Sequence, residues 1–409
     1  MQRFYNNIDS DTRMFGQISL DVILLFMLYG VGAAVAAGAC LYLVLRRANA
    51  FAPEVTPPVR LRRWTAAFFA VLAIGHLWYL PAAVLTDEDF TVCMLVSGLL
   101  DCVTVIPLVT VLLLCMLQDR QRPLWPVGVM TAPLVVLIVA GIVNRSEAYI
   151  PMVYGYLLLL GIGLIAYMVR AVRQYGRWLR ENFADLEHKE VWQTFVVLAV
   201  IVLMFGYYVV GYDGGMFYEY VIQVCGIVLV GHLLWRVETL SDLSGSGIQE
   251  DEETRRREYR NTGIQEDGNT GIQEGNAGPS PDTLSDDAYE EMTLLLQKHC
   301  IDTGLYLQHD LNKAQVAQAI GTNRTYLSLY FMRQETTYNA YINDLRIRHF
   351  IRLYREAIAA ERPVTAQQLA LMSGYRSYST FSLAFKQRMD QSVTAWMRRE
   401  KIEAGKDGN

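Results

Sequence analysis

Signatures of catalysis are missing from this sequence. It contains no glycine-rich loop with a lysine that would cradle a phosphate, no nucleophile elbow and no zincin motif. The six cysteines and six histidines are few for 409 residues, and no cysteines pair at the spacing of metal ligands. We therefore expect no enzyme, no cofactor and no metal site, and we interpret the cysteines as small reduced hydrophobic residues.

Charged residues are scarce in the first 237 positions. Seven apolar runs of about 20 residues fill this part, and that length spans the hydrocarbon core of a bilayer. The first run is long, lacks a basic start and is followed by further runs, so it does not fit a cleaved secretion signal. The sequence predicts a seven-span transmembrane domain with spans at 18–45, 64–85, 91–117, 125–143, 150–169, 191–210 and 216–235.

Basic residues gather in alternate loops between these runs. Thirteen lysines and arginines lie in one set of loops, against Arg3, Arg13 and Arg145 in the other. Loops rich in lysine and arginine stay in the cytoplasm, so we expect a bacterial inner-membrane protein with its amino terminus outside and its carboxyl terminus in the cytoplasm. Tryptophans fall at the predicted inner boundary, as interfacial anchors do; they are Trp64, Trp125, Trp192 and Trp235.

Two ionisable residues lie well inside the predicted spans. Asp101 falls near the middle of the third span and His76 lies within the second. An unpaired charge in the bilayer core costs at least about 3 kcal/mol, which makes such residues candidates for a function. They either order the bundle through an interhelical hydrogen bond or form an intramembrane site that senses a ligand or a proton, and both interpretations stay open.

The composition changes abruptly between residues 238 and 283. Gly-Ile-Gln-Glu occurs three times, beginning at Gly247, Gly263 and Gly271, among many Ser, Asn, Asp and Gly residues. Acidic residues outnumber the four arginines, and few side chains are apolar enough to bury. We expect a disordered acidic linker that serves either as a flexible tether or as a stalk that a protease cleaves.

Two stretches near the carboxyl terminus share one layout. In residues 368–386 a short apolar helix ends at Gly374, and a second helix opens at serines and threonines, which are good N-caps. In an earlier stretch a short helix ends at Gly321, and Thr322 and Asn323 open the next one. A long amphipathic segment, 338–359, joins the two. The pattern predicts two helix-turn-helix units, a motif whose second helix enters the major groove of DNA.

This region, residues 284–401, resembles the DNA-binding domain of AraC-type (AraC/XylS) transcriptional regulators, in which one long helix bridges two helix-turn-helix units. Asp390 stands where that family usually has Gly, Val393 where it usually has Pro, and the first unit lacks the corresponding Gly near residues 335–336. The resemblance implies an all-α domain that binds specific duplex DNA. It rests on Gln315, Val316, Ala317, Gly321, Tyr326, Leu327, Ser328, Phe331, Leu345, Arg346, Ile347, Leu369, Ala370, Gly374, Tyr375, Phe381, Phe385 and Lys386.

The charge of this region agrees with a nucleic-acid partner. Residues 322–401 hold thirteen Lys or Arg and six Asp or Glu, a balance of +7 in a chain whose net charge is −5. A basic surface supplies sequence-independent attraction to phosphates. The second unit has no Arg or Asn for bidentate pairing with G or A on its outward face, so we expect the first unit to discriminate more. The predicted DNA contacts are Asn323, Arg324, Thr325, Ser328, Leu329, Arg376, Tyr378, Ser379, Thr380, Ser382, Leu383 and Lys386.

Together these patterns predict an all-α protein with four parts: a seven-span transmembrane domain (1–237), the acidic linker (238–283), an AraC-type DNA-binding domain (284–405) and a frayed tail (406–409). We expect a membrane-bound transcription regulator whose bundle is a sensor or an anchor. Its expected partners are double-stranded DNA, the bilayer, an unknown small-molecule or membrane signal, and a second copy in a homodimer. The alternative is a transporter- or channel-like bundle whose occupancy controls the attached domain.

Overall fold

The computed structural model describes residues 20–46, 48–82, 93, 96–97, 99–120, 122–144, 147–197, 199, 215–243 and 284–407. Within these ranges the chain is helical, and its only β-type pairing is a bridge between Phe183 and Asn312. The predicted all-α class is therefore confirmed. The chain divides into two units, one of Met1–Arg173 with Val191–Leu243 and the other of Gln174–Glu190 with Ser244–Asn409.

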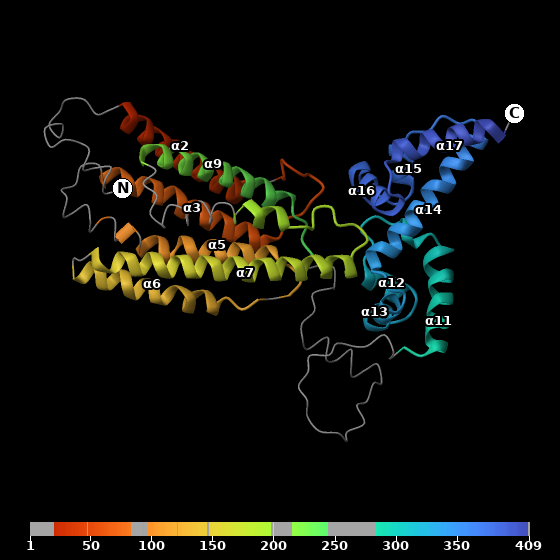
Figure 1. The fold of residues 1–409 in the computed structure, drawn as a ribbon, viewed down its shortest axis with the longest axis horizontal. Helices are drawn as coiled ribbons and strands as arrows, with labels where there is room; N and C mark the ends of the chain where they lie inside the picture. The colour runs from red at the N-terminus through yellow and green to blue at the C-terminus, as the bar shows by residue number, and fades with distance from the viewer. Residues whose placement is uncertain are drawn as a thin grey trace, which may run out of the picture. The chain divides into compact units, whose positions relative to one another are not determined.

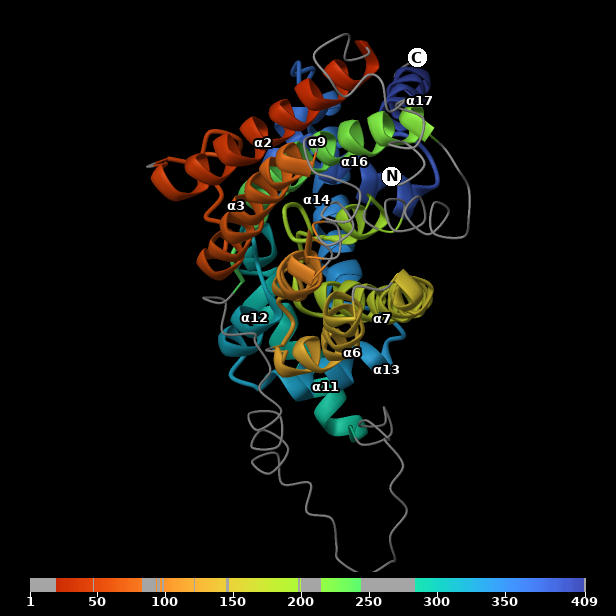
Figure 2. The same cartoon turned by 90° about the vertical axis from the view of Figure 1, so that its left-hand side faces the viewer.

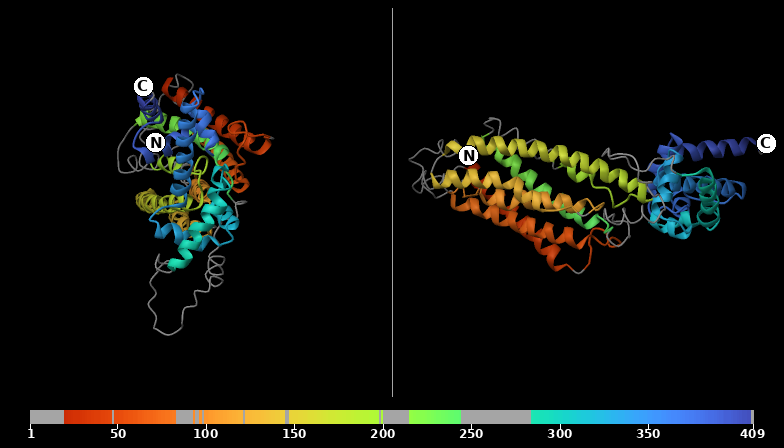
Figure 3. Two further views of the ribbon diagram at one scale, coloured as in Figure 1. Left: turned by 90° about the vertical axis from the view of Figure 1, so that its right-hand side faces the viewer. Right: turned by 90° about the horizontal axis from the view of Figure 1, so that it is seen from below.

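The first unit is a bundle of long apolar helices that lie side by side (Figures 1 and 3). Many of its large apolar side chains are exposed, among them Leu41 (57%), Val136 (67%) and Leu159 (69%). Such a surface is costly against water and stable against lipid tails. The helices are α2 (Leu20–Leu45), α3 (Val59–Ala82), α5 (Val105–Met116), α6 (Trp125–Val143), α9 (Gly215–Thr239) and α7 (Ile150–Asn182), whose residues from Gln174 onward belong to the second unit.

Five helical segments of the described residues are long and apolar enough to cross a membrane. They match the first, third, fourth, fifth and seventh predicted spans, which supports a membrane protein. The second predicted span, 64–85, coincides with α3 up to residue 82, and its last residues lie outside the described part. Most of the sixth, 191–210, also lies outside it. The number seven thus stays a prediction. The five segments are Ile23–Leu45, Leu99–Met116, Trp125–Val143, Ile150–Asn182 and Tyr220–Thr239.

The predicted start of the linker at residue 238 is wrong, because residues 238–243 pack against the bundle. Glu238 is fully buried and forms an ion pair with Arg46 at 2.9 Å. Gln118 donates to the carbonyl of Ser241 and accepts from the amide of Leu243, each at 2.9 Å. A buried charge needs a partner, so these contacts hold the end of α9. The rest of the predicted linker, from residue 244 to 283, lies outside the described residues.

The second unit consists of shorter helices, most of which begin at a side-chain cap. Asn323 accepts a hydrogen bond from the amide of Tyr326 and Ser377 from that of Thr380, as expected for N-cap residues. The last helix continues to Asp407, two residues into the predicted tail, whose fraying stays a prediction. The helices are α11 (Asp286–Leu296), continued by a π turn (Gln297–Ile301), then α12 (Lys313–Ala319), α13 (Arg324–Arg333), α14 (Tyr338–Ala359), α15 (Ala366–Met372), α16 (Tyr378–Met389) and α17 (Val393–Asp407).

Helix α14 contributes to two separate hydrophobic cores. Its first half, with Ile342, packs with α11, α12 and α13. From Ile347 onward, the helix packs with α15, α16 and α17, with Phe350 at the centre of the contact. Phe350 lies against Phe381 with ring centroids 4.5 Å apart. Figures 1 and 2 show α14 running from one group of helices to the other. The bounds of α14 agree with the predicted segment 338–359, and the α12–α13 pair and the α15–α16 pair are each attached to one half of it.

Glycine at the turn of each pair adopts the left-handed conformation that the sequence predicts. The φ angle is +73° at Gly321 and +87° at Gly374. The surroundings of the two residues differ. A Cβ atom at Gly374 would lie 2.8 Å from both the Cα and the carbonyl oxygen of Leu307, whereas a Cβ at Gly321 would meet nothing within 4 Å. Position 374 therefore needs glycine for two reasons and position 321 for one.

Two of the three departures from the AraC-type pattern, near residue 335 and at Asp390, keep the left-handed backbone conformation that glycine adopts readily. Glu335, directly after the C-cap of α13, has a φ of +51°, and Asp390, which ends α16, has a φ of +52°. For side chains other than glycine this conformation costs about 1–2 kcal/mol. The strain is local, and both helix ends are formed.

We expect Gly374→Ala to destabilise the α15–α16 pair by about 2–4 kcal/mol, from left-handed strain and overpacking together. Gly321→Ala, the matched control, should cost the α12–α13 pair only about 1–2 kcal/mol, because it adds strain without a clash. Native-state hydrogen exchange of the core amides in each pair measures both losses. Equal losses would contradict the close approach of Leu307 to Gly374.

Candidate nucleic-acid interface

Helix α13 presents a narrow polar edge. Its predicted DNA-contacting residues Arg324, Thr325 and Ser328 are half-buried. The Ser328 hydroxyl donates to the carbonyl of Arg324 and accepts from Nζ of Lys313, both at 2.7 Å. Lys313 thus brings a cation from α12 to the same edge. The cap residue Asn323 uses its side-chain oxygen to hold the start of the helix.

The prediction that Leu329 faces outward is wrong. Its side chain is only 1% exposed and belongs to the core of α11, α12 and α13. The exposed residue one turn further on is Met332, which is 43% exposed. Thr325, Ser328 and Met332 follow the spacing of one helical face. Met332 could have been predicted from the sequence, because it continues the helical spacing of Thr325 and Ser328 once Leu329 is assigned to the core.

Helix α16 exposes a longer edge. Leu383 is 61% exposed, and Ser379 and Lys386 are also exposed, whereas Ser382 is half-buried. Gln387, which sequence reasoning missed, is exposed beside Lys386. An outward leucine on such a helix matches the apolar contact that a thymine methyl group offers.

Tyr378 does not face outward as expected. It is partly buried against the core of α15, α16 and α17, with its ring centroid 6.0 Å from that of Phe381. The apolar ring finds a neighbour on the first turn of the same helix, which is the physical reason for its inward turn. Its neighbour Ser377 caps the helix instead.

Several arginines near the two edges form ion pairs within the unit. Arg333 pairs with Asp286 and donates to the carbonyl of Leu284 at 3.0 Å, so it fixes the start of α11. Arg388 binds Asp344 at 2.6 Å. Arg376, predicted to contact DNA, lies 2.9 Å from the carboxylate of Asp310. Part of the basic charge counted in the sequence is therefore balanced locally.

Arg346 connects the two helix pairs from inside the unit. It is fully buried on α14 and donates from Nε to the carbonyl of Tyr306 at 2.8 Å and from Nη2 to that of Gln308 at 2.7 Å. Its guanidinium also lies 5.4 Å from the ring centroid of Tyr375, next to the turn of the second pair. Burial lowers the pKa of Arg346 from its usual value, yet a guanidinium stays charged at neutral pH.

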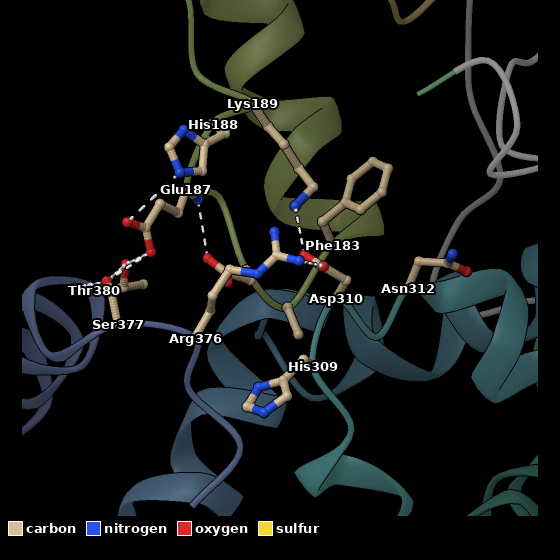
Figure 4. A network of polar contacts seen from close by, with 12 residues as sticks. Phe183, Glu187, His188, Lys189, His309, Asp310, Asn312, Arg376, Ser377 and Thr380 are labelled. Atoms are coloured by element: carbon tan, nitrogen blue, oxygen red, sulfur yellow. Dashed lines mark hydrogen bonds and ion pairs between the residues drawn. The ribbon is translucent and has the colours of Figure 1, made fainter. Parts of the chain in front are cut away.

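Residues 183–190, which follow α7, belong to this unit and contact both helix pairs; we call them the α7 loop (Figure 4). The amide of Ala184 donates to the carbonyl of Leu311 at 3.0 Å. The side chain of Asn339 donates to the carbonyl of Ala184 at 2.7 Å. Lys189 binds Asp310 at 3.1 Å. The loop is thus held by backbone and side-chain contacts to the segment before α12 and to α14.

Glu187 of the α7 loop reaches the start of α16. One carboxylate oxygen, Oε2, accepts hydrogen bonds from the hydroxyls of Ser377 at 2.6 Å and Thr380 at 2.7 Å (Figure 4). Thr380 is among the predicted DNA contacts. No sequence signal identified Glu187, because its partners lie about 190 positions away along the chain.

The two intramembrane candidates lie in the first unit. His76 on α3 contacts the carbonyl of Leu72 through Nδ1 at 2.7 Å and the side chain of Gln223 on α9 through Nε2 at 3.1 Å. Asp101 is half-buried in the segment Leu99–Met116. The His76–Gln223 contact is an interhelical hydrogen bond of the kind expected for an ordering role. A sensing role stays a prediction.

Comparisons with protein-family models, with curated proteins and with solved structures find no match to this chain. The AraC-type resemblance therefore rests on the residues quoted above.

Asp310 offers a test of the network by pH. Burial acts to raise the pKa of Asp310, but the charges of Lys189 and Arg376 together hold that pKa below its ordinary value. A carboxylate with a depressed pKa stabilises the fold above its unfolded pKa, and the contribution is lost as the pH falls through the folded value.

We expect Asp310→Asn to lower the free energy of unfolding by about 1 kcal/mol at neutral pH, since the site is partly screened by solvent, and by much less at pH values below the folded pKa. Asparagine tolerates the φ of +55° at this position. Thermal unfolding of the protein in nanodiscs at several pH values measures the effect. Asp287→Asn, at an exposed position of α11, is the control. A loss that does not depend on pH would contradict the ion pairs.

Proposed function

We propose that the protein is a membrane-tethered transcription regulator whose carboxyl-terminal domain binds specific duplex DNA through two helix-turn-helix units, in the manner of AraC-type regulators. The bundle serves as its membrane anchor or sensor. The observation that carries the proposal is the pairing of a short helix, a left-handed glycine and a capped second helix, which occurs twice in one unit.

The second helices have the features that groove entry requires. Each begins at a capped terminus whose backbone amides and hydroxyls suit a phosphate, and each leaves an edge free of the core. On α16 this edge carries Ser379, Leu383 and Lys386. On α13 it carries Thr325 and Met332. These short polar and apolar groups can reach base edges while lysine and arginine bind the backbone.

The bundle supports the membrane part of the proposal. A DNA-binding domain must lie in the cytoplasm, and the excess of basic residues in the loops that would face the cytoplasm agrees with that side. Five apolar segments among the described residues anchor the chain. We propose an inner-membrane location with the carboxyl-terminal domain in the cytoplasm.

Leu383→Asp should weaken binding to a specific duplex at least tenfold, because it places a negative charge on the edge expected to enter the groove, between the two phosphate backbones. Leu294→Asp is the matched control. Leu294 is 70% exposed on α11, a helix with no predicted DNA contact, so the same change should leave affinity unaltered. Genome-wide mapping with the intact protein supplies the duplex, and fluorescence anisotropy at several salt concentrations measures the affinity. An affinity that changes neither with salt concentration nor with Leu383→Asp would overturn the proposed function.

The first unit should carry more of the sequence discrimination. Arg324→Ala should relax the preference at the base pair it contacts by about 1–3 kcal/mol, whereas Ser382→Ala should leave site preference nearly unchanged. Selection of bound duplexes from a randomised pool measures both. If Ser382→Ala relaxes the preference and Arg324→Ala does not, the order of the two units is reversed.

A further inference from the structure

The α7 loop carries a negative charge to a position that DNA needs. Ser377 caps α16, and its hydroxyl and that of Thr380 both donate to Oε2 of Glu187. The start of a helix of this length has free backbone amides and a partial positive charge, and it therefore attracts anions. The Glu187 carboxylate accepts two hydroxyl hydrogen bonds there, and a phosphate oxygen could accept the same bonds.

A second contact of the same loop reaches Asp310, the carboxylate that pairs with the predicted DNA contact Arg376. Each oxygen of the Asp310 carboxylate has one cationic partner (Figure 4). Nζ of Lys189 lies 3.1 Å from Oδ1, and Nη2 of Arg376 lies 2.9 Å from Oδ2. Lys189 is 5% exposed at its side chain, so it belongs to the packed network. In this arrangement the guanidinium of Arg376 is paired with a carboxylate instead of a phosphate.

The loop is also firmly placed. Ala184 and Asp185 are each 2% exposed. Asn339 and Asn343 on α14 both donate to the carbonyl of Ala184. These contacts hold the backbone two to three residues before Glu187, and the carboxylate is 25% exposed. Its position at the start of α16 is therefore built into the unit.

We propose that the α7 loop is an autoinhibitory element: Glu187 occupies the phosphate-binding site at the start of α16, and DNA engages this helix fully only after the loop has moved away. The inference rests on the proposed function. A phosphate and the Glu187 carboxylate cannot share the same two hydroxyls, and their charges repel each other. Because the loop directly continues α7, a displacement of that helix is the change that would release it.

The test compares full-length variants in nanodiscs of mixed anionic and zwitterionic lipid, with a duplex taken from the mapped sites. Glu187→Gln removes the charge and keeps a hydrogen-bond acceptor, and it should tighten binding about five- to tenfold. Glu181→Gln makes the same change in net charge at an exposed position in the last turn of α7, and it should leave affinity unchanged. Unchanged or weaker binding by Glu187→Gln would overturn the proposal.

Leu383→Asp distinguishes a failure of the autoinhibition from a failure of the proposed function. If it weakens binding at least tenfold in both the wild-type and the Glu187→Gln background while Glu187→Gln tightens binding, both the proposed function and the autoinhibition are supported. If it weakens binding at least tenfold and Glu187→Gln has no effect, the autoinhibition fails and the proposed function survives. If no variant binds DNA in a salt-dependent way, the proposed function itself fails.

Hydrogen exchange provides a readout that does not depend on a variant. The amide of Ala184 donates to the carbonyl of Leu311 at 3.0 Å, a bond that should slow its exchange. Addition of the specific duplex to the wild-type protein should speed the exchange of the peptide that contains residues 183–190, because the loop leaves its site. Equal or slower exchange in the presence of DNA would contradict displacement of the loop.

Discussion

The guanidinium of Arg346 lies where the two cores of the second unit meet, and the geometry of the unit depends on it. It binds two backbone carbonyls, of Tyr306 and Gln308, in the segment before the first helix pair. It also lies over the ring of Tyr375, which follows the turn of the second pair. Removing one partner from a buried charge costs several kcal/mol. The two pairs therefore keep one relative position before any ligand binds.

This fixed position explains why the two turns differ. Gly374 packs directly against the backbone of Leu307, and a Cβ atom added at Gly374 would lie only 3.0 Å from Nε of Arg346. The turn of the second pair is therefore held tightly against the segment that precedes α12. Gly321 has open space around it, and the first pair is held by α11 and by the aromatic packing of Phe331 instead. Preorganised recognition surfaces lose little conformational entropy on binding, which favours readout of a defined site.

Sequence reasoning succeeded where local chemistry decides the structure and failed where tertiary contacts do. Gly321, Gly374 and the caps Asn323 and Ser377 follow from backbone rules, and the structure confirms them. Leu329 and Tyr378 were misplaced, because helical period alone does not tell which side a second core will cover. The linker boundary was missed because Glu238 is polar in sequence, and only its buried pairing with Arg46 shows that it belongs to the bundle. Glu187 could not be found at all, since no local pattern links it to Ser377.

In the proposed autoinhibition, a loop contact of modest strength is enough to oppose DNA, because the contact is intramolecular. Glu187 is part of the same chain as Ser377 and Thr380, so its effective concentration at the start of α16 is far higher than that of any duplex in solution. A few hydrogen bonds then suffice to lower the fraction of protein competent for binding, and apparent affinity falls by the same fraction. A signal received by the bundle would need only to shift this local equilibrium. The buried contacts of Arg346 could stay unchanged while Glu187 is exchanged for a DNA phosphate at the start of α16.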